Sequence, residues 1–100
     1  MSGPERRIVL SEQASRDIAD ILQYTFETWG ERQMDVYAAK LEKGIRLLGA
    51  RPLLGKPRRD LYPGCRCYRI EQHLVLYEVD EEEIRVARFL HKRMDVKRHG

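Results

Sequence analysis

Two stretches of the chain repeat their apolar residues at the spacing of an amphipathic helix. The recurring positions of the first are Ala14, Ile18, Ile21, Leu22, Thr25 and Trp29, and those of the second are Met34, Tyr37, Ala38, Leu41, Ile45 and Leu48. Gly30 separates the two stretches and favours a helix end with positive φ. Because so short a break makes consecutive helices run in opposite directions, the sequence predicts an antiparallel helical hairpin.

Runs typical of β-strands flank this hairpin. Residues 7–10 form a candidate first strand, and Ser11 is placed to cap the first helix. Prolines and glycines punctuate residues 51–64, which we therefore expect to be a loop. Three further strand-like runs follow, at residues 66–70, 74–79 and 84–90. Their connections are short enough to require antiparallel hairpins, and the nearly continuous apolar run in the second is typical of a central strand.

The predicted order is strand, helical hairpin and three-stranded antiparallel meander. The two helices cannot bury their apolar faces against each other alone, whereas the sheet offers them one face. The sequence therefore predicts an α+β fold, a two-layer sandwich. Its length favours a single domain over residues 1–100, with a basic C-terminal tail over about residues 91–100.

Strand alternation assigns faces to the residues of the meander. In the first of its strands, Tyr68 and Ile70 would face the core and Arg69 the open face, with Arg66 at the rim beside a carboxylate. In the last strand, Val86, Arg88 and Leu90 would share a face opposite Ala87, Phe89 and His91.

The charge of the chain is unevenly distributed. The net charge is +3, and charged residues make up 35% of the chain. Residues 1–50 hold 7 basic and 8 acidic side chains, whereas residues 51–100 hold 12 basic and 8 acidic ones. A basic second half favours anionic partners, either nucleic acid or an acidic segment of another protein.

Cys65 and Cys67 are the two cysteines, and a C-x-C pair rarely forms a disulfide because the ring would be strained. We expect reduced thiols that pack as half-buried side chains in a cytoplasmic protein, since no secretory signal or membrane-spanning run is recognised. Together with His73 they lack a fourth ligand at a recognisable spacing, so no metal site is predicted. Motifs for phosphate loops, zinc proteases and serine hydrolases are absent, and no cofactor is expected.

Basic residues near the end of the chain are the candidates for target binding. They are Arg66, Arg69, Arg88, His91 and Arg93. For Arg69 and Arg88, phosphate or carboxylate recognition and a surface salt bridge are equally supported, whereas Arg85 suits a salt bridge. His91 is interpreted as a residue that hydrogen bonds at a strand end, with acid–base chemistry in RNA cleavage as the alternative.

Several motifs along the chain occur in a characteristic order. The first half contributes Leu10, Ser11, Ala14, Ile21, Tyr24, Trp29, Gly30, Tyr37 and Leu41. The second half contributes residues 51–58 (RPLLGKPR), 63–66 (PGCR), 73–77 (HLVLY) and 88–95 (RFLHKRMD). Their order and spacing, and above all the last motif, resemble the ParE branch of the ParE/RelE toxin superfamily over about residues 8–95.

The resemblance implies the toxin of a type II toxin–antitoxin module, of the kind that stabilises plasmids. A ParE-like toxin would bind and inhibit DNA gyrase, and a ParD-like antitoxin would neutralise it in a hetero-oligomer and alone connect it to DNA. For antitoxin contacts we expect Trp29, Tyr37, Leu41, Arg58 and Arg59. No membrane partner is expected.

The alternative is a RelE-like, ribosome-dependent mRNA endoribonuclease, for which His91 would be the catalytic candidate. The tyrosine and the dense lysine group expected of RelE-like enzymes are absent, which favours the gyrase hypothesis. A third possibility is a degenerate member that only binds an antitoxin.

Overall fold

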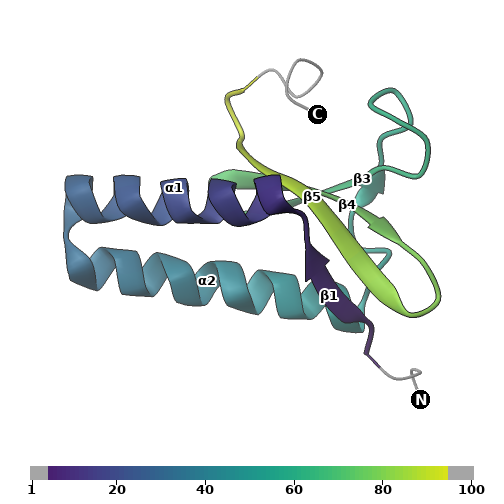
Figure 1. Ribbon diagram of the computed structural model, residues 1–100, viewed down its shortest axis with the longest axis horizontal. Coiled ribbons are helices and arrows are strands. Elements are labelled where there is room, and N and C mark those ends of the chain that lie inside the picture. The colour runs from purple at the N-terminus through teal and green to yellow at the C-terminus, as the bar shows by residue number, and fades with distance from the viewer. Residues whose placement is uncertain (1–4, 95–100) are drawn as a thin grey trace.

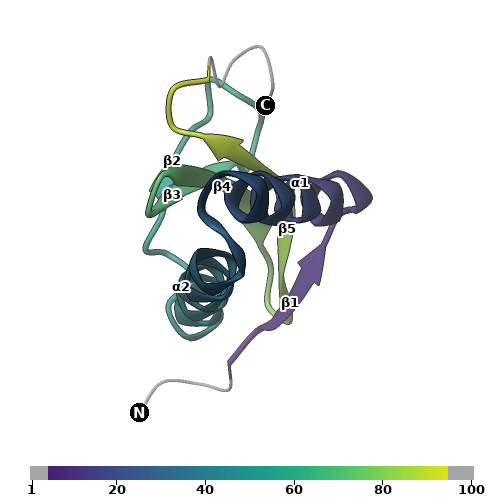
Figure 2. The same cartoon turned by 90° about the vertical axis from the view of Figure 1, so that its left-hand side faces the viewer.

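The computed structural model describes residues 5–94 (Figure 1). Its elements are β1 (Arg7–Leu10), α1 (Glu12–Trp29), α2 (Glu31–Ala50), β2 (Lys56–Pro57), β3 (Arg66–Ile70), β4 (His73–Val79) and β5 (Glu83–His91). The predicted α+β fold is confirmed. Figure 2 looks along the helical hairpin and shows the two helices side by side against the sheet.

The five strands form one sheet in the order β1-β5-β4-β3-β2. The predicted meander is present as β3, β4 and β5, which pair antiparallel with β4 in the middle. The first strand pairs in parallel with β5, so that Arg7 lies opposite Glu83. The predicted loop is wrong at Lys56–Pro57, which pairs with β3 at the sheet edge. Pro57 is compatible with that edge because a proline cannot donate a hydrogen bond to a second neighbour.

Local interactions set the ends of α1. The hydroxyl oxygen of Ser11 accepts a hydrogen bond of 2.9 Å from the backbone N–H of Ala14, so Ser11 is the predicted N-cap. At the other end, Gly30 adopts φ = +93°, a conformation that residues with a Cβ rarely adopt. The backbone N–H of Gly30 donates to the carbonyl of Phe26, and α2 begins at the next residue. The single glycine therefore reverses the chain between the helices.

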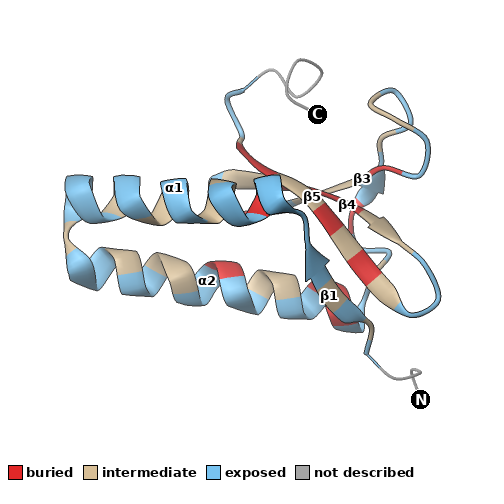
Figure 3. Cartoon of the chain, in the orientation of Figure 1, coloured by how far each residue is buried: buried red, intermediate tan, exposed pale blue. Residues whose placement is uncertain are grey.

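The core consists of two clusters, which strand alternation places on opposite faces of the sheet. Figure 3 shows buried residues along α2 and β5. The larger cluster joins the helices to the sheet through Ala14, Leu41, Leu48, Ile70, Val75, Tyr77, Ile84, Val86 and Phe89. The smaller one contains Cys65, Leu76 and Leu90, covered in part by Leu61 and Tyr62 of the preceding loop. Because Leu76 alternates with Val75 and Tyr77, β4 is buried on both faces, as its apolar run predicts.

A β-bulge in β5 overturns the predicted faces of the last strand. Leu76 pairs with Arg88 and Tyr77 pairs with Val86, which leaves Ala87 as the extra residue. Val86 therefore shares the larger cluster with Phe89, whereas Leu90 belongs to the smaller one. The hydroxyl of Ser11 donates to the carbonyl oxygen of Ala87 at 2.7 Å, so the start of α1 binds the bulge.

The two cysteines are free thiols in the smaller cluster. Cys65 is buried and Cys67 is half-buried, and burial raises the pKa of both thiols. Raised pKa values keep the thiols protonated and unreactive at neutral pH. They are packing groups, as the sequence predicts.

We expect the double substitution Cys65→Ser and Cys67→Ser to destabilise the fold by only about 1–3 kcal/mol, because two small polar groups replace thiols in an apolar cluster. Urea denaturation measures the change in the free energy of unfolding. The toxicity that the resemblance implies should persist at temperatures where the variant is folded. A folded variant without toxicity, or one bound zinc ion per wild-type chain, would contradict packing as the role of the thiols.

Candidate functional site

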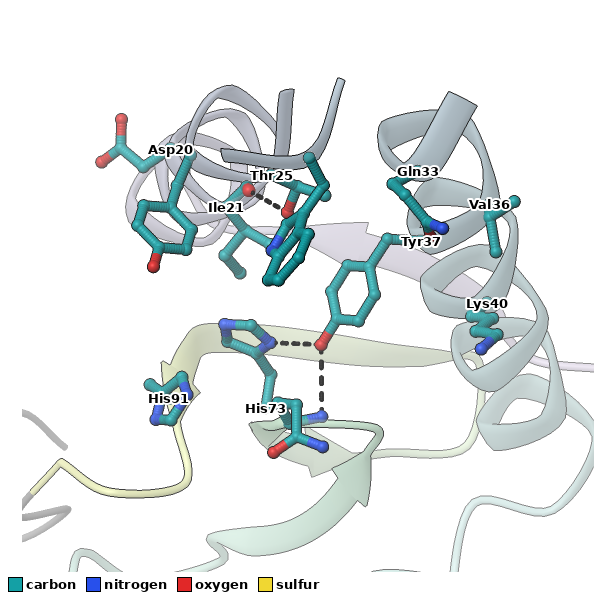
Figure 4. Close-up of a pocket in the computed structure, with 12 residues that line it drawn as sticks. Asp20, Ile21, Thr25, Gln33, Val36, Tyr37, Lys40, His73 and His91 are labelled. Carbon is teal, nitrogen blue, oxygen red and sulfur yellow. Dashed lines mark hydrogen bonds between the residues drawn. The ribbon is translucent and has the colours of Figure 1, made fainter. Parts of the chain in front are cut away.

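A pocket of about 670 Å³ lies between the helical hairpin and the adjoining ends of β4 and β5 (Figure 4). Its walls are mainly apolar and aromatic, and polar groups converge at its floor. The residues that define it are Tyr24, Trp29, Val36, Tyr37, His73 and His91. Tyr24 and Trp29 are 66% and 69% exposed, so two large aromatic side chains border the opening. A pocket of this size and composition is suited to bind a ligand or a side chain of a partner.

The floor of the pocket contains a hydrogen-bonded tyrosine–histidine pair. The Tyr37 hydroxyl lies 2.6 Å from Nδ1 of His73 and accepts a 3.2 Å hydrogen bond from the backbone N–H of Gln72. The hydroxyl has one proton and two acceptor lone pairs, so it can donate to Nδ1 of His73 or accept from it while it accepts from Gln72. Burial, and then the neighbouring His91, lower the pKa of His73 to about 4. The ring is therefore neutral at pH 7.

His91 continues this group of side chains toward the C-terminal tail. It lies opposite His73 in the strand register, and the two ring centroids are 5.4 Å apart in an edge-on arrangement. Nδ1 of His91 accepts a 3.1 Å hydrogen bond from the backbone N–H of Arg93. The sequence led us to interpret His91 as a residue that forms a hydrogen bond at the end of a strand, and this is such a bond. A neutral His91 ring in this arrangement carries its proton on Nε2.

Two of the arginines predicted to bind the target interact with groups of the chain itself. Nε of Arg66 donates to the carbonyl of Gly55 at 2.9 Å, and Nη2 donates to Leu53 at 3.1 Å. The carboxylate expected beside Arg66 is thus replaced by loop carbonyls. Arg88 pairs with Asp17 of α1 at 2.8 Å, and the same carboxylate accepts the backbone N–H of Phe89 at 2.9 Å. This ion pair joins α1 to β5.

The remaining candidates lie near one end of the sheet. Arg69 is exposed and donates from Nε to the Glu71 carbonyl at 2.8 Å. Its register partner Leu74 adjoins His73, which pairs with His91. Arg93 is exposed just beyond His91. The register thus places Arg69 and His91 near the same end of the sheet but on opposite faces, since Arg69 lies on the face of Leu90 and His91 on the face of the helices. Arg66 lies at the other end of β3. Arg85 forms the predicted surface salt bridges, with Asp80, Glu83 and Glu78.

The predicted antitoxin contacts separate into three groups. Trp29 and Tyr37 line the same pocket, 8 residues apart in the chain but on different helices. Leu41 is 2% exposed and packs in the larger core cluster, so its side chain lies beneath the surface of this structure. Arg58 and Arg59 lie in the loop before β3, where Arg58 pairs with Asp60 at 2.8 Å and Arg59 is exposed.

Residues 5–94 hold no group of three or more His, Cys, Asp or Glu side chains arranged to bind a metal ion. Over the same residues, neither helix is long and apolar enough to cross a bilayer. The arrangement of the pocket instead combines aromatic walls with two imidazole N–H groups, which is a binding geometry for a partner with apolar and acceptor groups.

The fold has solved counterparts among toxin–antitoxin proteins. A chain of the chromosomal ParDE TA system from P. aeruginosa superimposes with a TM-score of 0.74 at 17% identity, covering 87% of this chain and 96% of the other. A chain of the E. coli DinJ-YafQ toxin–antitoxin complex gives a TM-score of 0.61 at 19% identity, covering 87% and 92%. At these identities the likeness concerns the fold.

Sequence comparison assigns the family. The model of the ParE toxin of the type II toxin–antitoxin system parDE matches residues 8–96. Toxin ParE of Escherichia coli is 39% identical over 90 residues, covering 88% of this chain and 86% of that toxin. Toxin ParE1 of Mycobacterium tuberculosis is 34% identical over 94 residues, covering 93% and 96%. The chain belongs to the ParE toxin family, as its motifs predict, and its partner is an antitoxin.

Proposed function

We propose that this toxin inhibits DNA gyrase by binding it, and that a ParD-like antitoxin neutralises the toxin in a cytoplasmic hetero-oligomer. The surface offered to gyrase is the end of the sheet that carries Arg69 and His91, together with Lys92 and Arg93 of the tail. Both Lys92 and Arg93 are exposed. Cationic side chains beside an exposed strand end suit an acidic surface of a partner protein.

One observation carries this proposal over an enzymatic one. Among the described residues, three of the side chains predicted to bind the target interact with groups of the chain itself: Arg66 with carbonyls, Arg88 with Asp17 and His91 with the Arg93 N–H. Acid–base cleavage of RNA requires groups that transfer protons in the transition state. Binding requires only a fixed surface, which these interactions provide.

The ribonuclease alternative is favoured by a different observation. Two histidines and a tyrosine share the floor of one pocket, and the pKa of His73 is strongly shifted. Shifted pKa values cluster at catalytic sites. Burial and the adjacent imidazole are sufficient to explain the low pKa of His73 without a catalytic role. The ribonuclease is therefore the second candidate function.

Expression of the chain alone is expected to arrest growth through broken DNA, because a gyrase poison stops the enzyme in mid-reaction. The measurement scores induction of the DNA-damage response and the rate of protein synthesis over the first minutes after induction. Co-expression of the antitoxin encoded beside the toxin gene should restore growth. Arrest of translation before any DNA damage would contradict the proposal and favour the ribonuclease.

A further inference from the structure

The loop between α2 and β2 turns its carbonyl groups toward the sheet. The Tyr77 hydroxyl of β4 donates to the Pro52 carbonyl at 2.7 Å and accepts from the Gly55 N–H at 2.8 Å. Arg66 of β3 donates to the carbonyls of Gly55 and Leu53, at 2.9 Å and 3.1 Å. A Cβ at Gly55 would lie 2.5 Å from the Tyr77 hydroxyl oxygen, so only glycine allows the backbone to approach this closely. The loop is therefore fixed to the sheet by a buried tyrosine and by an arginine.

The same loop turns its apolar side chains toward solvent. Leu53 is 68% exposed and Leu54 is 38% exposed. Apolar side chains that gather on a surface mark sites of interaction, whereas single exposed ones do not. Here the two leucines border a groove of about 470 Å³, whose other lining residues are Arg6, Arg51, Pro52 and Val79. The groove lies where β1 meets the C-terminal end of α2, at the end of the hairpin opposite the turn between the helices (Figure 1).

The groove carries a positive charge. Its lining contains two arginines and no acidic residue. Nε of Arg6 donates to the backbone carbonyl of Asp80, and within residues 5–94 the Arg51 side chain forms no ion pair. The carboxylates of Asp80 and Glu83 in the neighbouring turn pair with other arginines. Two cations beside apolar walls complement a protein segment that carries an apolar side chain next to a carboxylate.

We propose that this groove is a second contact of the toxin with gyrase, separate from the basic end of the sheet. An apolar side chain of gyrase packs against Leu53 and Leu54, and a neighbouring carboxylate pairs with Arg51 and Arg6. The inference rests on the proposed function, because the occupant is gyrase. It adds a binding surface and the chemistry of the gyrase segment that fits it.

The fixed loop favours a folded partner as the occupant. A flexible segment can adapt to a mobile loop, whereas the surface of a folded enzyme adapts little, so a loop ordered in advance lowers the entropic cost of binding to it. A second copy of the toxin is disfavoured, since a symmetric pair would bring the same arginines together. A lipid surface is disfavoured because the site is concave and offers only two leucines for insertion.

One large partner can contact both this groove and the basic end of the sheet. Val79 of the groove pairs with Ile84 at the start of β5, whereas His91 ends the strand. The two sites are thus separated by roughly 20–25 Å along β5, at about 3.4 Å per residue. A standard protein–protein interface of about 800 Å² on each partner extends over such a distance.

The contact is tested by binding of purified gyrase to the full-length toxin. Leu53→Ala removes an exposed apolar side chain from the groove, whereas Leu47→Ala removes the same atoms from α2, at a site that is 40% exposed and does not line the groove. Leu53→Ala should raise the Kd for gyrase about tenfold or more, and Leu47→Ala should leave it within about twofold. Arg51→Gln should also raise the Kd and weaken its dependence on salt concentration.

Tyr77→Phe tests whether the fixed conformation of the loop matters. Tyr77 is fully buried and cannot touch gyrase, but loss of its hydroxyl frees the loop at Pro52 and Gly55. The Kd for gyrase should rise by about threefold to tenfold, because the loop must then be ordered on binding. The affinity for the antitoxin encoded beside the toxin gene should not change, whereas a general loss of structure would weaken both complexes. An unchanged Kd for gyrase would overturn the positioning role of Tyr77.

The outcomes separate the two proposals. Failure of the wild-type toxin to bind gyrase would overturn the proposed function, and the groove contact with it. Wild-type binding that neither Leu53→Ala nor Arg51→Gln weakens would overturn the groove contact alone. The contact would also be overturned if Leu53→Ala kept gyrase binding and instead lost the antitoxin, self-association in sedimentation, or binding to vesicles of anionic phospholipid, because the groove would then belong to that other partner.

Discussion

A chain that ends at Leu90 should lose gyrase inhibition completely and remain folded. Leu90 is 1% exposed and is the last residue of the core, whereas residues 92–94 are exposed. The truncation removes the hydrogen bond from the Lys92 N–H to the Gln72 carbonyl, and the pairing of His91 with His73. Lost hydrogen bonds of this kind cost about 0.5–1.5 kcal/mol each, which a folded domain tolerates.

The reason for the loss is that the truncation removes the basic residues offered to gyrase. A matched control ends at Asp95, which lies outside the described residues, and keeps residues 91–95 while it removes the rest of the tail. Purified chains are compared in a gyrase supercoiling assay, with thermal unfolding as the check on folding. Full inhibition by the chain that ends at Leu90 would place the target-binding surface elsewhere, whereas failure of both chains would extend it past Asp95.

Local periodicity explains why most of the fold could be predicted. The helical hairpin follows from two amphipathic repeats broken by Gly30, and the meander follows from runs separated by very short connections. The sequence pattern alone does not show which segments pair when they lie far apart in the chain. The parallel pairing of β1 with β5 joins residues about 76 positions apart, and β2 is two residues long. The bulge at Ala87 accepts a hydrogen bond from Ser11, and no local pattern reveals this contact.

The candidate site was predicted less completely, because a helical repeat does not say which of its members stay exposed. Trp29 and Tyr37 line the pocket, whereas Leu41 from the same apolar face is buried. His73 was overlooked as part of the site, since only the register of β4 and β5 brings it beside His91, 18 residues later. The position of each histidine at the end of an antiparallel run is the sequence signal that could have paired them.

The variant His91→Gln should distinguish gyrase binding from RNA cleavage. Glutamine keeps an amide donor, and its side-chain oxygen can accept the Arg93 N–H that Nδ1 of His91 accepts. The titratable ring is lost. A toxin that works by binding should therefore keep its inhibition of gyrase, whereas a ribonuclease that relies on this ring should lose about 10²–10⁴ in rate. Alanine at Arg88 is less informative, because Arg88 holds Asp17 and its loss also weakens the fold.

The measurement places the wild-type and His91→Gln proteins side by side in a gyrase supercoiling assay and a ribosome-dependent mRNA cleavage assay. His73→Gln is the matched control on the neighbouring strand, since it removes the other imidazole of the pair. Equal thermal stability of the three proteins ensures that a difference in activity reflects the loss of an imidazole and not unfolding. Unchanged gyrase inhibition by His91→Gln, with no mRNA cleaved by the wild type, is the expected result. Cleavage by the wild type that is lost in His91→Gln would replace the gyrase proposal with a ribonuclease in which His91 transfers the proton.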